Sequence, residues 1–115
     1  MEGEMLKGHL DMIVLAALAA AGSAHGYAVI EEIKRRSGGA FDLPEGTIYP
    51  ALHRQEQAGL LTSRWTTSDA GRRRRVYSLT KAGTRALAER RAVWTQFSDA
   101  IGSLLGGARP RETPA

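Results

Sequence analysis

Apolar residues recur at helical spacing in three segments of the first half of the chain. The segments span residues 9–21, 26–37 and 45–58, and one or two glycines follow each of them. Side chains at positions i, i+3, i+4 and i+7 share one face of a helix, so this spacing predicts three helices. The residues that we expect to face inward are Leu10, Ile13, Val14 and Ala17 in the first, Ile30 and Ile33 in the second, and Ile48, Ala51 and Leu52 in the third.

The second half begins with the two-residue period of β-strands. Residues 61–66 and 75–79 alternate between two sets of side chains, and a turn-forming stretch at 67–71 separates them. The pattern predicts a two-stranded β-hairpin, with arginines at its tip and on its returning strand.

Residues 81–105 return to helical spacing and predict a long last helix, for which Thr80 is a suitable N-cap. Its apolar residues repeat every seven positions with a second set between them, a seam typical of a helix that packs across a dimer. These residues are Leu87, Trp94, Phe97, Ile101 and Leu104. The charged tail that follows, residues 106–115, is rich in Gly and Pro and is predicted to be disordered.

The composition of the chain favours a small binding protein over an enzyme or a metal-binding protein. The chain has 115 residues, which fits one domain, and a net charge of +4 that is concentrated in four consecutive arginines at positions 72–75 and a second cluster at 34–36. The absence of cysteine excludes disulfides and thiolate metal sites, and the three histidines have no metal-ligand spacing. Because the sequence also has no phosphate-binding loop or nucleophile motif, we expect no enzymatic activity, cofactor or metal.

The longest apolar run, Met12 to Ala21, is too short to span a bilayer, which needs about 20 residues. Together with Lys7 and the small residues at 22–24 this run imitates a signal peptide, but three acidic residues among the first eleven argue against one. We therefore expect a cytoplasmic protein without membrane contact.

The order helix, helix, helix, hairpin, helix predicts a winged helix-turn-helix fold, which is mainly α with a small β part (α+β). The winged domain would span residues 6–80, and a C-terminal dimerisation helix would span 81–105. In such a fold the third helix is narrow enough to enter the major groove of DNA, and arginines of the hairpin reach phosphates of the neighbouring backbone. The sequence therefore favours a regulator that binds double-stranded DNA.

The candidate DNA-contacting residues lie on the third helix and in the hairpin. They are Thr47, Tyr49, His53 and Arg54, which point away from the inward stripe, and Arg72, Arg73 and Arg74 of the arginine run. Exposed helix residues and charge runs are often merely solvated, and this interpretation stays open for each of them. Gln55 falls on the inward stripe instead, where an unpaired amide costs about 1–3 kcal/mol.

Several stretches resemble the PadR family of transcriptional regulators. They are LPEGTIYPALHRQEQAGLL from Leu43 to Leu61, KGHLDMIVLAAL from Lys7 to Leu18, HGY from His25 to Tyr27, and RRRVYSLTKAG from Arg73 to Gly83. The resemblance covers nearly all of residues 6–105, and the single C-terminal helix is similar to the compact subfamily. It departs at Gln55, where the family usually has an apolar residue.

The resemblance implies a cytoplasmic bacterial regulator, usually a repressor, that dimerises through its first and last helices. It also implies that some members respond to phenolic acids or drug-like molecules at the dimer interface. With the heptad seam, it predicts a homodimer whose interface includes Leu10, Val14, Leu87, Trp94, Phe97, Ile101 and Leu104. Two identical recognition helices would read an inverted-repeat site.

Two aromatic residues have alternative interpretations. Trp94 fits packing in the dimer best, and its second interpretation is a platform for a small aromatic effector. Tyr27 is expected in the core, with its hydroxyl near a phosphate as the alternative.

A winged helix can also serve as a protein-interaction module without DNA binding, because fold alone does not determine function. The arginine-rich hairpin argues against this alternative.

Overall fold

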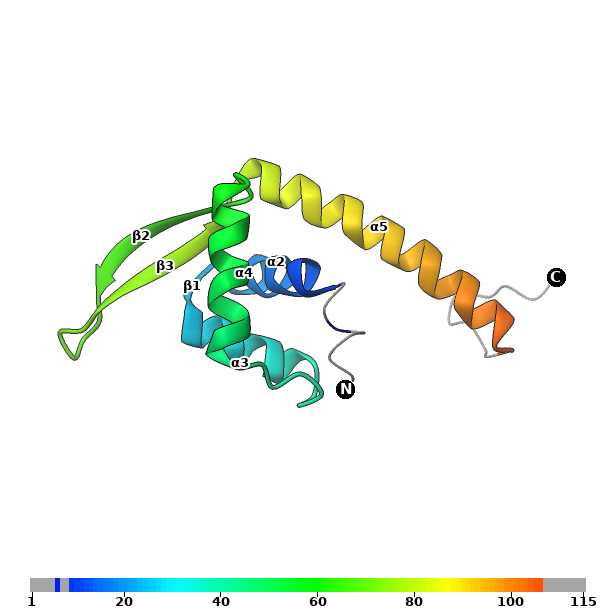
Figure 1. Cartoon of the computed structure of the whole chain (residues 1–115), viewed down its shortest axis with the longest axis horizontal. Helices are drawn as coiled ribbons and strands as arrows, with labels where there is room; N and C mark the ends of the chain where they lie inside the picture. The colour runs from blue at the N-terminus through cyan, green and yellow to red at the C-terminus, as the bar shows by residue number, and fades with distance from the viewer. Residues whose placement is uncertain (1–5, 7–8, 107–115) are drawn as a thin grey trace.

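Three helices, a β-hairpin and a long last helix follow one another in the predicted order (Figure 1). The computed structural model describes residue 6 and residues 9–106; the greater part of the predicted tail, from residue 107 on, lies outside the described residues. In chain order the elements are α2 (Leu10–Ala21), β1 (Ser23–His25), α3 (Gly26–Arg36), α4 (Glu45–Gln57), β2 (Leu61–Thr67), β3 (Arg73–Leu79) and α5 (Lys81–Leu104). The α+β winged-helix prediction is therefore confirmed.

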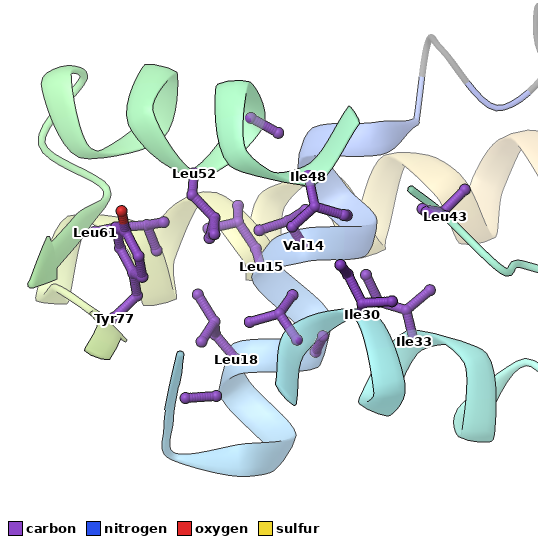
Figure 2. Close-up of a cluster of buried hydrophobic side chains, with 14 of the residues drawn as sticks. Val14, Leu15, Leu18, Ile30, Ile33, Leu43, Ile48, Leu52, Leu61 and Tyr77 are labelled. Atoms are coloured by element: carbon purple, nitrogen blue, oxygen red, sulfur yellow. The ribbon is translucent and has the colours of Figure 1, made fainter. Parts of the chain in front are cut away.

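The core lies where α2, α3 and α4 meet, and the hairpin closes it from one side (Figure 2). The predicted inward stripes supply most of it, since all their residues are buried except Leu10 and Ile13, which are half-buried. The largest contributors are Val14, Leu15 and Leu18 of α2, Ile30 and Ile33 of α3, Ile48 and Leu52 of α4, Leu61 of β2 and Tyr77 of β3. Because α4 turns its apolar side into this core, its opposite side faces outward.

The sheet has three strands rather than the predicted two. Its order is β1-β3-β2, and the short strand β1 pairs antiparallel with β3, placing Ala24 opposite Tyr77 and His25 opposite Val76. The two-stranded prediction was incomplete because three residues are too few to display a strand period, and their pairing partners lie about fifty positions away in the chain. The consequence is that the base of the wing is tied to the start of α3.

The start of α5 is locked to the turn between α4 and β2. Thr80 is the N-cap, as predicted: its Oγ1 accepts a hydrogen bond from the backbone N–H of Gly83 at 3.0 Å and donates one to the carbonyl of Gly59 at 2.6 Å. The N–H of Thr80 also donates to the carbonyl of Leu60 at 3.0 Å. A Cβ on Gly83 would collide with that same Leu60 oxygen, so the close approach needs glycine here.

The N-terminal part of α5 packs on the body of the protein, Trp94 in its middle still meets the His9 ring, and the C-terminal part extends away (Figure 1). Leu87 is 4% exposed and belongs to the core of the same chain. Farther along, the helix exposes Val93, Trp94, Phe97, Ile101, Leu104 and Leu105. Most of the predicted seam is therefore an uncovered apolar stripe within this chain.

Candidate nucleic-acid interface

The outward face of α4 carries three of the four helix residues that the sequence singled out. His53 is exposed, Tyr49 is 36% exposed, and Thr47 is half-buried in the first turn. The face exists because Ile48, Ala51, Leu52 and Gln55 fill the inward side of the helix. It is narrow and has polar side chains, which suits a surface that enters a groove.

Tyr49 packs against the beginning of α3. A Cβ on Gly26 would overlap the Tyr49 ring, so the ring rests on bare backbone at this position. Tyr27, the next residue, is 56% exposed, and the expectation that it lies in the core is wrong because its position in the first turn of α3 turns it outward. Two tyrosines thus lie where α3 begins beside α4.

Arg54 is separated from the other candidates of α4. Its Nη2 donates to Asp11 Oδ1 of α2 at 2.7 Å, on the side of the helix that faces α2 and α5. We therefore leave Arg54 out of the proposed DNA-contacting set. Helical periodicity placed it off the core correctly, but the ion pair depends on a residue 43 positions earlier in the chain.

The arginines of the wing divide between its two faces. Directly paired residues of β2 and β3 share a face, so Trp65, Arg73 and Arg75 lie on the face that continues from Tyr77 and the core. The guanidinium carbons of Arg73 and Arg75 lie 4.8 Å and 5.2 Å from the centre of the Trp65 ring. On this face two cationic side chains contact an exposed indole.

Arg74 lies on the opposite face of the wing, beside His25 of β1. Its Nη1 lies 3.4 Å from His25 Nε2, and a guanidinium only donates, so this contact requires an unprotonated Nε2. Partial burial and the charge of Arg74 both lower the pKa of His25, which favours the same neutral form. Arg72 lies in the exposed turn, where its N–H donates to Ser68 Oγ at 3.2 Å.

The second basic cluster is partly paired with nearby carboxylates. Lys34 lies 3.6 Å from Asp42, and Arg35 and Arg36 lie 2.7 Å and 3.9 Å from the carboxylate of Glu32. These residues end α3, where positive charge also compensates the helix dipole. The concentrated positive charge that could meet a polyanion is that of the wing.

A groove of about 960 Å³ separates the start of α2 from the middle of α5. Trp94 forms its aromatic wall, with the His9 ring edge-on at 5.2 Å and the Phe97 ring tilted at 6.0 Å. Charges of both signs complete it, from Asp11, Arg54, Glu89 and Arg90. Leu10 also lines the groove. Val14, which was predicted together with Leu10 to lie in the dimer interface, is 0% exposed.

The sequence pattern misplaced some functional candidates and missed others. Val14 and Leu87 are corrected from interface to core residues, since a buried side chain cannot reach a second molecule. Trp65, Arg75 and His25 were not among the predicted DNA-contacting residues. Only the strand register brings Trp65 beside Arg75, and His25 beside Arg74. No described helix is long and apolar enough to cross a membrane, and residues 6 and 9–106 contain no cluster of metal-ligating side chains.

Comparison with known proteins gives a consistent result. A profile described as the transcriptional regulator PadR-like family matches residues 14–89. The transcriptional regulator Rv3488 of Mycobacterium tuberculosis is 41% identical over 89 residues, which cover 77% of each chain.

Solved structures share the fold. A PadR family transcriptional regulator from Eggerthella lenta is 33% identical with a TM-score of 0.75, covering 89% of this chain and 86% of its own. The PadR protein of Bacillus subtilis, solved in complex with operator DNA, is 23% identical with a TM-score of 0.63, covering 92% of this chain and 49% of its own. At that identity the likeness shows the fold.

Proposed function

Since the chain belongs to the PadR-like family of transcriptional regulators, we propose that it binds double-stranded DNA as a symmetric homodimer and acts as a repressor in the bacterial cytoplasm. The observation that carries the proposal is the juxtaposition of the exposed face of α4 with a wing that holds five arginines, Arg64 of β2 and the run at positions 72–75. The helix enters the major groove, and the wing contacts the neighbouring phosphates. The Bacillus subtilis PadR protein, which shares this fold, was solved in complex with operator DNA, and this supports DNA binding by the present chain.

The two contact sets have different roles and can be separated. Tyr49 and His53 face the bases, so Tyr49→Ala or His53→Ala should change which sequences are preferred. Arg72 and Arg74 face phosphates, which are the same in every sequence. Replacing both with Ala should weaken binding to all sequences alike.

The experiment is selection of genomic fragments by the purified protein, followed by titration at several salt concentrations. The slope of log K against log salt is negative, and each lost phosphate contact makes it shallower by about 0.9. The double arginine variant removes two arginines from each subunit of a dimer, so its slope should be shallower by up to about 3.6. Lys81→Ala with Arg85→Ala removes the same charge from the exposed start of α5 and should leave the slope unchanged. A slope that is the same in the wing variant as in the wild type would contradict the proposal, and an absence of DNA binding would favour the protein-interaction alternative.

The homodimer is supported by the uncovered stripe on α5. Phe97 is 55% and Ile101 39% exposed on a helix that extends beyond the body, and a second copy supplies a matching stripe. A two-fold dimer should prefer an inverted repeat whose half-sites lie about 34–36 Å apart.

Light scattering tests the dimer directly. Ile101→Asp should dissociate or unfold it, whereas Thr95→Asp, which changes an exposed residue off the stripe, should not. A well-folded wild-type monomer at micromolar concentration would contradict the dimer.

The groove beside Trp94 supports an effector of planar aromatic chemistry, held where the second subunit closes the groove. Titration with phenolic acids and flat aromatic cations should quench the fluorescence of Trp94. Trp65 also emits, so Trp94→Phe is the control. Identical quenching of the wild type and this variant would contradict the effector site.

A further inference from the structure

The exposed indole of Trp65 has no packing role in the core. It is 54% exposed on β2, farther out along the wing than the buried residues Leu61 and Tyr77. Its ring meets the guanidinium groups of Arg73 and Arg75, at 4.8 Å and 5.2 Å from the ring centre. An indole is the aromatic side chain that attracts a cation most strongly.

A chain of hydrogen bonds connects the same face of the wing to α4. The Nε of Arg75 donates to Ser63 Oγ at 2.8 Å, and that hydroxyl donates to Glu56 Oε2 at 2.6 Å. Glu56 lies in the last turn of α4. Arg75 is thus held by the indole and, through Ser63, by the recognition helix.

A cation–π contact with a ring orders a guanidinium without using its donors. In Arg75 the Nε–H already donates to Ser63 Oγ, so its Nη1 and Nη2 groups are the donors left for phosphate oxygens. An unrestrained arginine loses rotamer freedom when it binds, which costs roughly two- to tenfold in affinity for each side chain. A wing that has already ordered two arginines avoids part of that cost.

We propose that Trp65 is a positioning residue for DNA binding: it holds Arg73 and Arg75 in the orientation that meets the phosphate backbone, next to α4. The inference rests on the proposed function and deepens it. It implies that Trp65 orders only the arginines on its own face of the wing, because Arg72 and Arg74 do not contact its ring.

The first test needs no DNA. In the full-length protein, ¹⁵N relaxation of the arginine Nε–H groups should show Arg73 and Arg75 more ordered than Arg72. In Trp65→Leu the order of Arg73 should fall to that of Arg72, whereas Arg75, whose Nε also donates to Ser63, should lose only part of its order. In Trp65→Phe, which keeps a ring, the order of Arg73 should partly return. Equal mobility of Arg73 in the wild type and in Trp65→Leu overturns the proposal.

The second test measures DNA affinity. Trp65→Leu should raise Kd about five- to tenfold and leave the melting temperature close to that of the wild type, since the ring lies outside the core. The salt slope should stay near the wild-type value, because the arginines remain present. Trp65→Phe should recover part of the affinity.

Double-mutant cycles then separate positioning from direct contact. Trp65→Leu should have no further effect on Kd when Arg73 and Arg75 are both Ala, whereas its effect should persist when Arg72 and Arg74 are both Ala. A full effect in the first background would mean that Trp65 itself touches DNA and would overturn the proposal. A wild type that binds no DNA would overturn the proposed function, and the relaxation measurement would still decide whether Trp65 orders the arginines.

Discussion

Gln55 is the feature of the fold that most directly predicts a change in stability. It is 2% exposed on the inward side of α4, where the rest of the stripe is apolar. Its Nε2 donates to the carbonyl of Asp11 at 3.4 Å, and its Oε1 is buried with no hydrogen-bond partner among the described residues. Methionine has the same unbranched shape without the amide, so Gln55→Met should stabilise the protein.

The expected gain in stability is estimated from the two polar atoms of the Gln55 amide, Oε1 and Nε2. A buried acceptor without a partner costs about 1–3 kcal/mol, and the substitution removes that cost. The hydrogen bond lost at Nε2 is long and contributes less than about 1 kcal/mol, and the Asp11 carbonyl keeps its acceptor role within α2. The net gain in the free energy of unfolding should be about 1–2 kcal/mol. For a chain of this length it corresponds to a melting temperature about 4–8 °C higher.

Urea and thermal unfolding, measured at one fixed protein concentration because association adds stability, provide the assay. Gln57→Met, an exposed position of the same helix, is the matched control and should change the free energy of unfolding by less than about 0.5 kcal/mol. If Gln55→Met is no more stable than the wild type while the control behaves as expected, the amide oxygen is satisfied in solution and the reasoning fails.

Three further predictions follow from the same structure. Gly83→Ala should destabilise the protein by about 3 kcal/mol in urea unfolding, because the new Cβ meets a backbone carbonyl that cannot rotate away. The control Gly102→Ala places its Cβ in open space on the same helix and should not destabilise the protein. Gly26→Ala should displace the Tyr49 ring and alter the preferred DNA sequence in a selection experiment, and an unchanged preference would show that the ring does not contribute to recognition. Because the pKa of His25 is lowered below its ordinary 6.5, the unfolded chain takes up a proton first as the pH falls, so the free energy of unfolding should decrease as the pH drops below about 6.5. The decrease should be smaller in His25→Gln. If the free energy of unfolding depends on pH in the same way in this variant and in the wild type, His25 is not the cause of the decrease.

Every element except the short strand β1 could be predicted from the sequence, and so could the buried sides of α2, α3 and α4. The period of apolar residues depends only on the local geometry of helix and strand, which is why the stripes at Ile48 and Leu52 and the cap at Thr80 could be predicted. The same period placed Gln55 in the core correctly, because every residue on a buried helix face is buried, whether it is polar or apolar.

The neighbour that each face meets depends on how the elements pack in three dimensions. Val14 and Leu87 are as apolar as interface residues are, and nothing local tells a core of one chain from a core shared by two. The pairing of Arg54 with Asp11 and the cation–π contact of Arg75 with Trp65 likewise depend on packing and strand register. Register joins residues far apart in the chain, so no periodicity within one segment reports it.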